Sequence, residues 1–531
     1  MKNGKRPALA GILALTGLLA LGACSGNTEN QPSSGAGSSE TSTAGSEAQT
    51  GQGRVSDEPL TFKWLAYDRR EAPIKEDWPV FEAIRDQTNV TVEFELAPGG
   101  LAEKRQIMIA TNSVTDFIPV PHSDARTYGP DGVFLNLADY MDEYAPNLKQ
   151  FFAEYPEAEA LVTGEDGGIY AVPTLEGVGF NYAWIVRADL MDEYGLDNPT
   201  SPDEFYTLLK TLKQHHPDTY PLVPERGNHN GPATLFTPIL RAFSGLEGYI
   251  PMDPESDEYV FAGDHPGFRE ALEFMHKLHE EELLDPEFAI LKPAQWEERM
   301  LSGKGLVTWF WKTRVASFNS AADEAALIPG FQMSAMPQFA AEGVTDYQYS
   351  RDYIGVNGIA ISGQIKEKEA AVRFLDYLVG EEGANYLAYG IEGTTYEFVD
   401  GEAKFLESLG PAPYALLRGE YGVWYPEINL NNGKSRAAER LSEEAQAIED
   451  MYSPIVRQAP KPLVLTAEET ELQIAKQSNL NTYMDQKISE FIAGRIAITD
   501  ESIADFIAQC RKLGAYELRD MYNAAYERVY E

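Results

Sequence analysis

Two tryptophans separated by one residue are the feature of this chain whose type and spacing most directly suggest a binding chemistry. Trp309 and Trp311 lie in the segment Val-Thr-Trp-Phe-Trp-Lys-Thr-Arg at positions 307–314. Alternate side chains of a strand face the same side, so both indoles would share one face. Flat rings stack on the apolar C–H faces of sugars, while polar side chains bond the hydroxyls. The pair predicts a sugar-type contact surface, and a core position for the rings is the competing interpretation.

Further residues are candidates for the same site, because they follow a predicted strand or accompany an aromatic segment. They are Tyr67, Asp68, Arg69, His122, Asp124, Tyr182, Trp184, Arg351, Asp352 and Trp424. Three other tryptophans, Trp64, Trp78 and Trp296, are expected in structural positions, since they lie in or beside predicted strands and helices.

No motif of the chain assigns a catalytic chemistry. The sequence has no Gly-rich phosphate loop ending in Lys-Ser or Lys-Thr. It also has no Gly-x-Ser-x-Gly elbow and no reactive Cys with a staged His. The 83 acidic residues offer no pair that can be singled out as the two carboxylates of a glycosidase. We therefore expect that this protein is not an enzyme.

The His and Cys residues also favour structural roles. His276 and His279 flank Lys-Leu, whereas the helix of a zinc protease needs His-Glu-x-x-His. We expect these two histidines on a solvated helix face, without a metal. Cys510 falls on a helical stripe with Phe506 and Ile507, which predicts a buried core thiol. No metal or cofactor site is predicted.

The elements that would position these residues begin with an alternation of strand and helix patterns. Strands are predicted at 60–66, 90–96 and 117–120, with amphipathic helices at 78–86 and 101–110 between them. This order is typical of a parallel sheet with helices on its faces. Ligands of such sheets lie beyond the carboxyl ends of the strands, where residues 67–69 and 121–124 fall.

The middle and the end of the chain are more helical. Helices are predicted at 203–214, 267–283 and 366–378 and over most of the last 65 residues, and a strand is predicted at 358–362. The body from residue 59 to 531 is longer than the roughly 250–300 residues at which one core stops growing, which predicts two lobes.

The first 24 residues resemble the signal of a bacterial lipoprotein. Three basic residues among the first six precede a short apolar run at 8–21, and Leu-Gly-Ala-Cys occupies 21–24. The run is too short to span a bilayer comfortably. The resemblance implies a signal peptide at 1–23, cleavage before Cys24 and lipid modification of its sulfur. A plain secretory signal with a chance cysteine is the alternative.

The segment that follows has the composition of a tether. Residues 25–58 are rich in Ser, Gly, Thr, Glu and Gln and contain no aromatic residue, Leu or Ile. Such a segment cannot bury enough apolar surface to offset its ordering entropy. We expect a flexible linker at 24–58 that holds the body about 30–35 Å from a membrane.

The charge of the chain excludes some partners. The formal net charge is −40 at pH 7. Nucleic acid binding depends on Lys and Arg that neutralise phosphates, and docking to anionic lipid depends on basic patches. We therefore expect no nucleic acid partner and no electrostatic docking to a membrane, and the charge favours a soluble body that stays monomeric.

Five motifs in the same order resemble one family. They are Asp-Gly-Val-Phe-Leu-Asn-Leu at 131–137 with Tyr-Ala-Pro-Asn at 144–147; Asp-Gly-Gly-Ile-Tyr-Ala-Val-Pro at 166–173; Leu-Asp-Pro-Glu-Phe at 284–288; Gly-Ile-Glu-Gly-Thr-Thr-Tyr at 390–396 with Phe-Val-Asp-Gly at 398–401; and Asn-Leu-Asn-Thr-Tyr-Met-Asp at 479–485. The chain resembles large extracellular solute-binding lipoproteins of ABC sugar importers, the family-1 type common in Gram-positive bacteria.

The resemblance implies an α/β fold of the two-lobe, type II periplasmic-binding-protein class, with a ligand cleft between the lobes and a helical C-terminus. In this family the chain crosses between lobes more than once. We expect lobe 1 to contain residues 59–178 and 347–400, and lobe 2 to contain residues 179–346 and 401–531.

The resemblance also implies a function. The protein would be anchored by lipid on the extracellular face of the cell membrane, capture an oligosaccharide by lobe closure and deliver it to ABC permease subunits. Two alternatives stay open. One is a lipoprotein of the same fold that binds a peptide or acts in sensing, and the other is a surface-anchored polysaccharide-degrading enzyme.

One departure from similar oligosaccharide binders concerns calcium. Those proteins often carry a calcium loop after the helix that ends here near His215. This chain has His-Pro-Asp-Thr-Tyr-Pro-Leu at 216–222 instead. Calcium takes six to eight oxygen ligands, and a short loop with one Asp cannot supply them. We predict no calcium at this position.

Overall fold

The structure is a computed structural model that describes much of the body of the chain. The described residues are 54–67, 73–75, 77–97, 100–176, 179–225, 233–325, 328–345, 348–349, 354–410, 413, 416–425, 430–431, 433–434 and 442–530. They all belong to one compact unit, Gly53–Glu531. The predicted lipid attachment residue Cys24 and the predicted site residues Asp68, Arg69, Arg351 and Asp352 lie outside the described residues.

The first sheet has the strand order β2-β1-β3-β11-β4. β1 (Leu60–Ala66) pairs in parallel with β2 (Val90–Leu96) and β3 (Phe117–Pro121), with α1 (Pro79–Thr88) and α2 (Leu101–Ala110) as the crossovers. This confirms the predicted alternation. β11 (Ile354–Ile361) completes the sheet as its one antiparallel strand, paired on one side with β3 and on the other with β4 (Val172–Leu175), which runs in the direction of β3.

Aromatic rings fill the core behind this sheet. The Trp64 ring stacks on Phe117 at 4.8 Å, and Phe117 meets Phe374 of α13 (Lys368–Val379) at 5.7 Å. Trp64 and Trp78 are fully buried, as predicted. The Trp78 indole N–H donates to the Gly419 carbonyl at 3.1 Å, which satisfies its polar atom inside the core.

The second sheet has the strand order β8-β5-β9 and is antiparallel. Its strands are β5 (Tyr182–Arg187), β8 (Val307–Trp311) and β9 (Met333–Met336). Leu222 adds parallel bridges to Val307 and to Leu284, which extends the sheet beyond β8. The segment that carries Trp309 and Trp311 is thus a strand, which is the condition under which both rings share one face.

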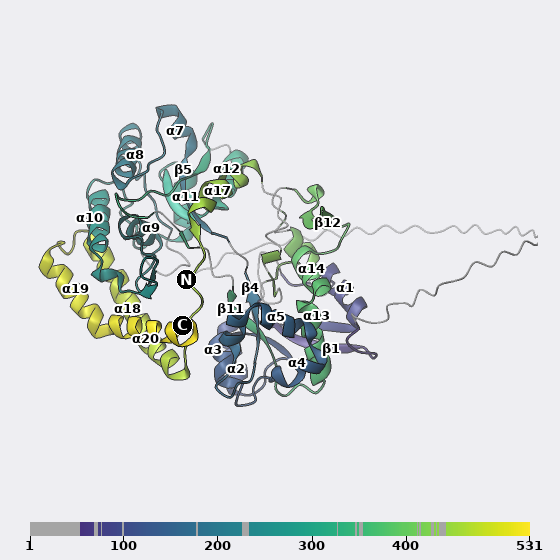
Figure 1. Ribbon diagram of the computed structural model, residues 1–531. Helices are drawn as coiled ribbons and strands as arrows, with labels where there is room; N and C mark the ends of the chain where they lie inside the picture. The colour runs from purple at the N-terminus through teal and green to yellow at the C-terminus, as the bar shows by residue number, and fades with distance from the viewer. Residues whose placement is uncertain are drawn as a thin grey trace, which may run out of the picture. The chain divides into compact units, whose positions relative to one another are not determined.

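Helices cover this second sheet, and the predicted ones are present. They include α7 (Ala188–Tyr194), α8 (Pro202–His215), α9 (Ala233–Ser244), α10 (Pro266–Glu280), α11 (Pro293–Leu301), α12 (Arg314–Ala325) and α17 (Glu443–Tyr452). The C-terminal helices are α18 (Ala467–Ile492), α19 (Asp500–Leu513) and α20 (Ala515–Tyr530). α10 packs against α9 and α18, and α18 packs against α19 and α20 (Figure 1). Cys510 of α19 is fully buried, and burial raises the pKa of its thiol to about 12. This confirms the predicted core thiol.

The remaining elements connect or cap these layers. The helices are α3 (His122–Tyr128), α4 (Ala138–Tyr144), α5 (Pro146–Glu154), α6 (Pro156–Val162), α14 (Glu381–Tyr389) and the short η1 (Ala262–Asp264), η2 (Glu407–Leu409), η3 (Leu417–Tyr421) and η4 (Ser453–Ile455). The strands are β6 (Met252–Asp253), β7 (Glu258–Tyr259), β10 (Gln348–Tyr349), β12 (Tyr396–Val399), β13 (Glu402–Phe405) and β14 (Val456–Arg457).

The buried apolar residues form two separate cores. One core draws on residues 62–175 and 354–430, and the other on residues 180–339 and 448–525. The described buried apolar residues between positions 403 and 430 pack in the first core, where Phe405 contacts Tyr389 and Tyr425 contacts Trp78 at 5.4 Å. The predicted division placed this segment in lobe 2. The domain boundaries themselves stay a prediction.

Candidate functional site

Four of the predicted site residues lie on one face of the second sheet. The β5–β8 register pairs Tyr182 with Trp311 and Trp184 with Trp309. Directly opposed residues of antiparallel strands share a face, and so do residues two apart on one strand. We call Tyr182, Trp184, Trp309 and Trp311 the aromatic face.

The aromatic face is graded from a buried end to an exposed end. The Trp184 side chain is fully buried, Trp309 is 5% exposed and Trp311 is 39% exposed. The Tyr182 ring lies parallel to the Trp309 ring, with centroids 6.0 Å apart and planes at 14°. Only the end formed by Tyr182 and Trp311 therefore offers a ring surface to a ligand in this conformation.

Trp184 has a structural role at the buried end. Its ring packs against Phe205 and Phe339, with centroids 4.9 and 5.5 Å away. The Trp184 backbone N–H donates to the Tyr452 hydroxyl at 2.9 Å, which in turn donates to the Met336 carbonyl at 2.9 Å. The Trp184 ring also packs against the Trp309 ring, with centroids 5.5 Å apart. Because its neighbours enclose it completely, the Trp184 ring offers no surface to a ligand.

The hydroxyl of Tyr182 stays protonated at physiological pH. Burial raises the pKa of Tyr182, the negative charge of Glu225 raises it further, and a hydrogen bond with the Trp311 side chain lowers it. Glu225 itself is 4% exposed. The exposed end of the aromatic face thus places a phenol and a buried carboxyl beside two flat rings.

Arg241 of α9 adds a cation to this face. Its guanidinium carbon lies 5.1 Å from the Trp309 ring centroid. The residue is 2% exposed, and its Nη1 pairs with Glu247 at 3.3 Å. Its Nε and Nη2 are buried and have no hydrogen-bond partner in the described part of the chain. Arg241 was not among the predicted site residues, although it is the only charged residue in the apolar sequence of α9.

A second group of predicted residues lies where two neighbouring strands of the first sheet end. Tyr67 follows β1 directly and is 36% exposed, and its carbonyl accepts a hydrogen bond from the Tyr425 hydroxyl. His122 and Asp124 lie at the start of α3, directly after β3. Since β1 and β3 are parallel neighbours, these residues share the carboxyl edge of the sheet, as predicted.

His122 is the buried member of this edge. It is 8% exposed, and its Nε2 has no hydrogen-bond partner within the described ranges. Burial lowers the pKa of His122 to about 4, with the positive charge of Arg126 adding to the effect and a hydrogen bond to the Asn357 backbone opposing it. At neutral pH the ring is therefore an uncharged hydrogen-bonding group.

The Asp124 carboxylate of α3 is engaged by two side chains of α2. Its Oδ2 lies 3.6 Å from Arg105 Nε and accepts a hydrogen bond from Gln106 Nε2 at 3.2 Å. Burial raises the pKa of Asp124, while Arg105 lowers it. The carboxylate thus joins α3 to α2, and only 17% of its side chain is exposed.

The sequence of the chain matches a known protein family. The profile of the bacterial extracellular solute-binding protein family matches residues 69–385, more than half of the chain. The chain belongs to this family. The family is named for the binding of solutes and not for a reaction.

Named relatives point the same way. The chain is 27% identical to the fructooligosaccharide ABC transporter substrate-binding protein FusA of Streptococcus pneumoniae over 39% of its length, which covers 41% of FusA. It is 23% identical to lipoprotein LipO of Bacillus subtilis, over 85% of this chain and 89% of LipO. A solved structure of the alginate-binding protein AlgQ2 without calcium matches with a TM-score of 0.72 and 25% identity, over 90% of this chain and all of that one. These matches establish the predicted α/β two-lobe binding-protein fold.

Trp424 occupies the core of this solute-binding protein. It is 5% exposed, its ring meets Phe405 edge-on at 6.0 Å, and its backbone N–H donates to the Leu387 carbonyl. Its φ of 62° lies in the left-handed region, which costs energy for a residue with a side chain. The packing of its indole therefore holds a strained turn, and ligand contact through this ring is limited by burial.

The histidines of α10 differ from the prediction. They were expected on a solvated face, but both are half-buried. His276 Nδ1 lies 3.0 Å from the Ile492 carbonyl, and the His279 ring meets Phe288 edge-on. The reason is tertiary, because α18 packs on this side of α10. No cluster of three or more His, Cys, Asp or Glu side chains that could hold a metal occurs in the ranges that the structure describes.

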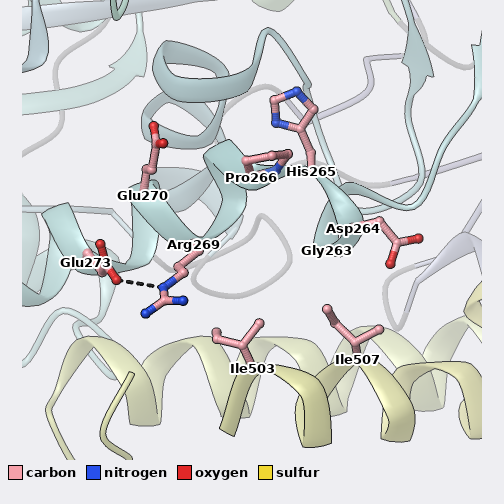
Figure 2. Close-up of a pocket in the computed structure, with 9 residues that line it drawn as sticks. All are labelled: Gly263, Asp264, His265, Pro266, Arg269, Glu270, Glu273, Ile503 and Ile507. Atoms are coloured by element: carbon pink, nitrogen blue, oxygen red, sulfur yellow. Dashed lines mark hydrogen bonds and ion pairs between the residues drawn. The ribbon is translucent and has the colours of Figure 1, made fainter. Parts of the chain in front are cut away.

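A pocket elsewhere on this solute-binding protein contains none of the predicted site residues. It lies between the η1–α10 segment and α19, where Ile503 and Ile507 face Asp264, His265 and Arg269 (Figure 2). Arg269 pairs with Glu273 at 2.8 Å and with Asp500 at 2.5 Å. The Arg269 guanidinium of this pocket is thus already paired within the protein.

Proposed function

We propose that this protein is the lipid-anchored extracellular substrate-binding subunit of an ABC importer, which captures an oligosaccharide by closure of two lobes and delivers it to a permease. No bond of the sugar is broken. A ligand shifts an open–closed equilibrium only as far as it binds the closed form better.

The observation that carries the proposal is the exposed end of the aromatic face. Tyr182 and Trp311 offer flat ring surfaces beside a phenol hydroxyl and the buried Glu225. Apolar rings flanked by hydrogen-bonding groups match the two kinds of surface on a sugar.

The carboxyl edge of the first sheet supplies the opposite side of the proposed site. Tyr67 and the uncharged His122 lie there, and Asp68 and Arg69 follow Tyr67 in sequence. We include Asp68, Arg69, Arg351 and Asp352 in the site from sequence position alone. We assign Trp184 and Trp424 to support of the site, since both rings are enclosed by the core.

The names of the relatives support an oligosaccharide as cargo. One relative is named for fructooligosaccharide and one solved structure is titled as an alginate-binding protein. Both names describe sugar polymers, although the sugars differ. The proposal therefore commits to an oligosaccharide and leaves its monomer to the experiment.

The anchoring part of the proposal rests on sequence. Leu-Gly-Ala-Cys at 21–24 fits lipid attachment at Cys24, and the relative LipO is named a lipoprotein. Among the described residues, no helix is long and apolar enough to cross a membrane. We propose that residues 24–58 tether the two lobes to the membrane. We assign residues 403–430 to lobe 1, because the described buried apolar residues of that range pack in the first core.

The test is tryptophan fluorescence of the purified protein titrated with a panel of plant, algal and bacterial oligosaccharides. A saturable change with one class, with that sugar recovered unchanged by chromatography, is expected. A shortened sugar would establish the enzyme alternative instead. Binding of peptides and of no sugar in the panel would favour the peptide or sensing alternative.

A further inference from the structure

The buried cation of the aromatic face has a hydrogen-bonding edge that the protein does not use. Arg241 donates through Nη1 to Glu247, whereas Nε and Nη2 have no hydrogen-bond partner among the residues described. These two atoms lie on the same edge of the planar guanidinium, and their N–H bonds point the same way. A buried charged donor that lacks an acceptor is costly, so such an edge calls for an acceptor from outside the chain.

The same lobe shows what such an edge binds. Arg187 is 4% exposed and lies over the Phe331 ring at 4.4 Å, much as Arg241 lies over Trp309. Its Nε and Nη2 donate to the two carboxylate oxygens of Asp189 at 2.7 and 2.5 Å. Arg187 and Arg241 are thus matched in burial and ring contact, and they differ in whether a carboxylate fills the Nε–Nη2 edge.

We propose that the oligosaccharide bound by this protein carries a carboxylate, as a uronic acid does, and that this group fills the Nε–Nη2 edge of Arg241. Two parallel charge-assisted hydrogen bonds would form, as in the Arg187–Asp189 pair. A pair of neutral hydroxyls fits the same edge but supplies no charge. The inference rests on the proposed function and narrows its cargo to acidic oligosaccharides.

Charges around the site set the orientation of the sugar. Glu225 acts on Tyr182, whose pKa it raises, so a carboxylate at that end would meet a like charge. At the Trp309 end, Arg241 carries one ion pair, with Glu247, and its other edge is open to an acceptor. The acidic group is therefore placed over Trp309, and neutral hydroxyls are placed beside Tyr182 and Glu225. Arg241 is 2% exposed in this conformation, so the proposal requires that the opening motion of the proposed function uncover its Nε–Nη2 edge.

The test compares two ligands that differ only in charge. Oligogalacturonides and alginate oligosaccharides are each titrated beside the same chains after reduction of the carboxyl groups to hydroxymethyl groups. The mature protein is used in detergent, with calorimetry as the readout. We expect a uronate chain to bind at least about tenfold more tightly than its reduced counterpart, as the loss of a charge-assisted pair predicts.

Three variants assign the effect to Arg241. R241Q and R241K should each weaken uronate binding about 10- to 100-fold and change binding of any neutral chain by less than about threefold, because Lys keeps the charge but lacks the two-donor edge. R187Q is the matched control, since it removes an equally buried arginine and should leave the uronate preference intact. Circular dichroism checks that each variant is folded. If R241Q does not fold, the comparison is made with R241K alone.

Each other outcome overturns a different statement. Neutral chains bound as tightly as uronate chains would overturn the inference and leave the proposed function in place. A uronate preference that persists in folded R241Q or R241K would remove Arg241 as its cause. Binding of no oligosaccharide of either kind would overturn the proposed function and the inference with it.

Discussion

The Tyr182 ring lies parallel to the Trp309 ring across two antiparallel strands, 6.0 Å between centroids and 14° between planes. The β5–β8 register produces this arrangement, because it puts Tyr182 opposite Trp311 and one pair away from Trp309 on the same face. The rings are thus held by backbone pairing, which keeps them in place before any ligand arrives. Such preorganisation lowers the entropy lost on binding.

Replacement of Trp311 by Ala should weaken oligosaccharide binding while leaving the fold intact. The ring is 39% exposed, so its removal opens no core cavity, but it deletes a stacking surface. Loss of the buried apolar area and of aromatic stacking predicts a cost of about 1.5–3 kcal/mol, or about 10- to 100-fold in affinity. Fluorescence titration or calorimetry measures it.

Phe398→Ala is the matched control for Trp311→Ala, because Phe398 is 46% exposed on the β12–β13 hairpin, outside the proposed site. Its affinity should equal that of the unaltered protein. Equal affinity of the Trp311 variant would remove this ring from the site.

Tyr452→Phe should destabilise the second sheet. The Tyr452 hydroxyl accepts a hydrogen bond from the backbone N–H of Trp184 in β5 and donates one to the backbone carbonyl of Met336 in β9, both at 2.9 Å. The residue is fully buried, so removal of the hydroxyl leaves a buried donor and a buried acceptor with one partner fewer. We expect a loss of about 1–3 kcal/mol in the free energy of unfolding, measured by urea denaturation.

Tyr483→Phe is the control for that measurement. Tyr483 stacks on Phe506 with centroids 5.9 Å apart, and within the described ranges its hydroxyl is influenced by burial and by nearby charges but by no hydrogen bond. Its variant should stay within about 0.5 kcal/mol of the unaltered protein. Equal effects of the two substitutions would contradict the bridging role of Tyr452.

The free energy of unfolding should fall between about pH 6.5 and pH 4, because folded His122 resists the proton that it binds in the unfolded chain. Its pKa is lowered from 6.5 to about 4 in the folded state, so between these values the unfolded chain binds a proton that the folded chain does not. The contribution of His122 to the free energy of unfolding is therefore complete above about pH 6.5. It is lost as the pH falls toward 4, by about 3 kcal/mol in all.

His122→Gln isolates this contribution from the many carboxylates that titrate in the same range. The difference in unfolding free energy between the two proteins should change by about 3 kcal/mol between pH 7 and pH 4. A difference that does not vary with pH would show that His122 titrates normally in the folded protein.

The loop at 216–222 should not bind calcium. It contains a single acidic residue, Asp218, and its Thr219 hydroxyl donates to the His216 carbonyl at 2.7 Å, so that carbonyl is already engaged. Metal analysis of the purified protein should find no stoichiometric calcium, and a chelator should leave the thermal midpoint unchanged. Calcium bound in a one-to-one ratio, lost on mutation of Asp218 to Asn, would contradict this prediction.

The sequence by itself determined the local elements and the family. Periodicity predicted β1, β2, β3 and the helices between them, because each pattern of apolar residues repeats with the period of its own backbone. The spacing of Trp309 and Trp311 likewise predicted a shared face, since alternation on a strand is a local property. Five motifs in order indicated the family that the profile match establishes.

Only the tertiary structure decided which of these side chains are accessible and which are enclosed. Trp184 and Trp311 look alike in sequence, yet Phe205 and Phe339 close over the first, and the second ends its strand at the surface. His276 became half-buried because α18, about 200 residues later, packs on α10. Arg241 of α9 likewise lies over Trp309 of β8, a contact between residues 68 positions apart in the sequence. Burial and ring contact depend on segments distant in sequence, and local patterns carry no information about which distant segment will cover a given face.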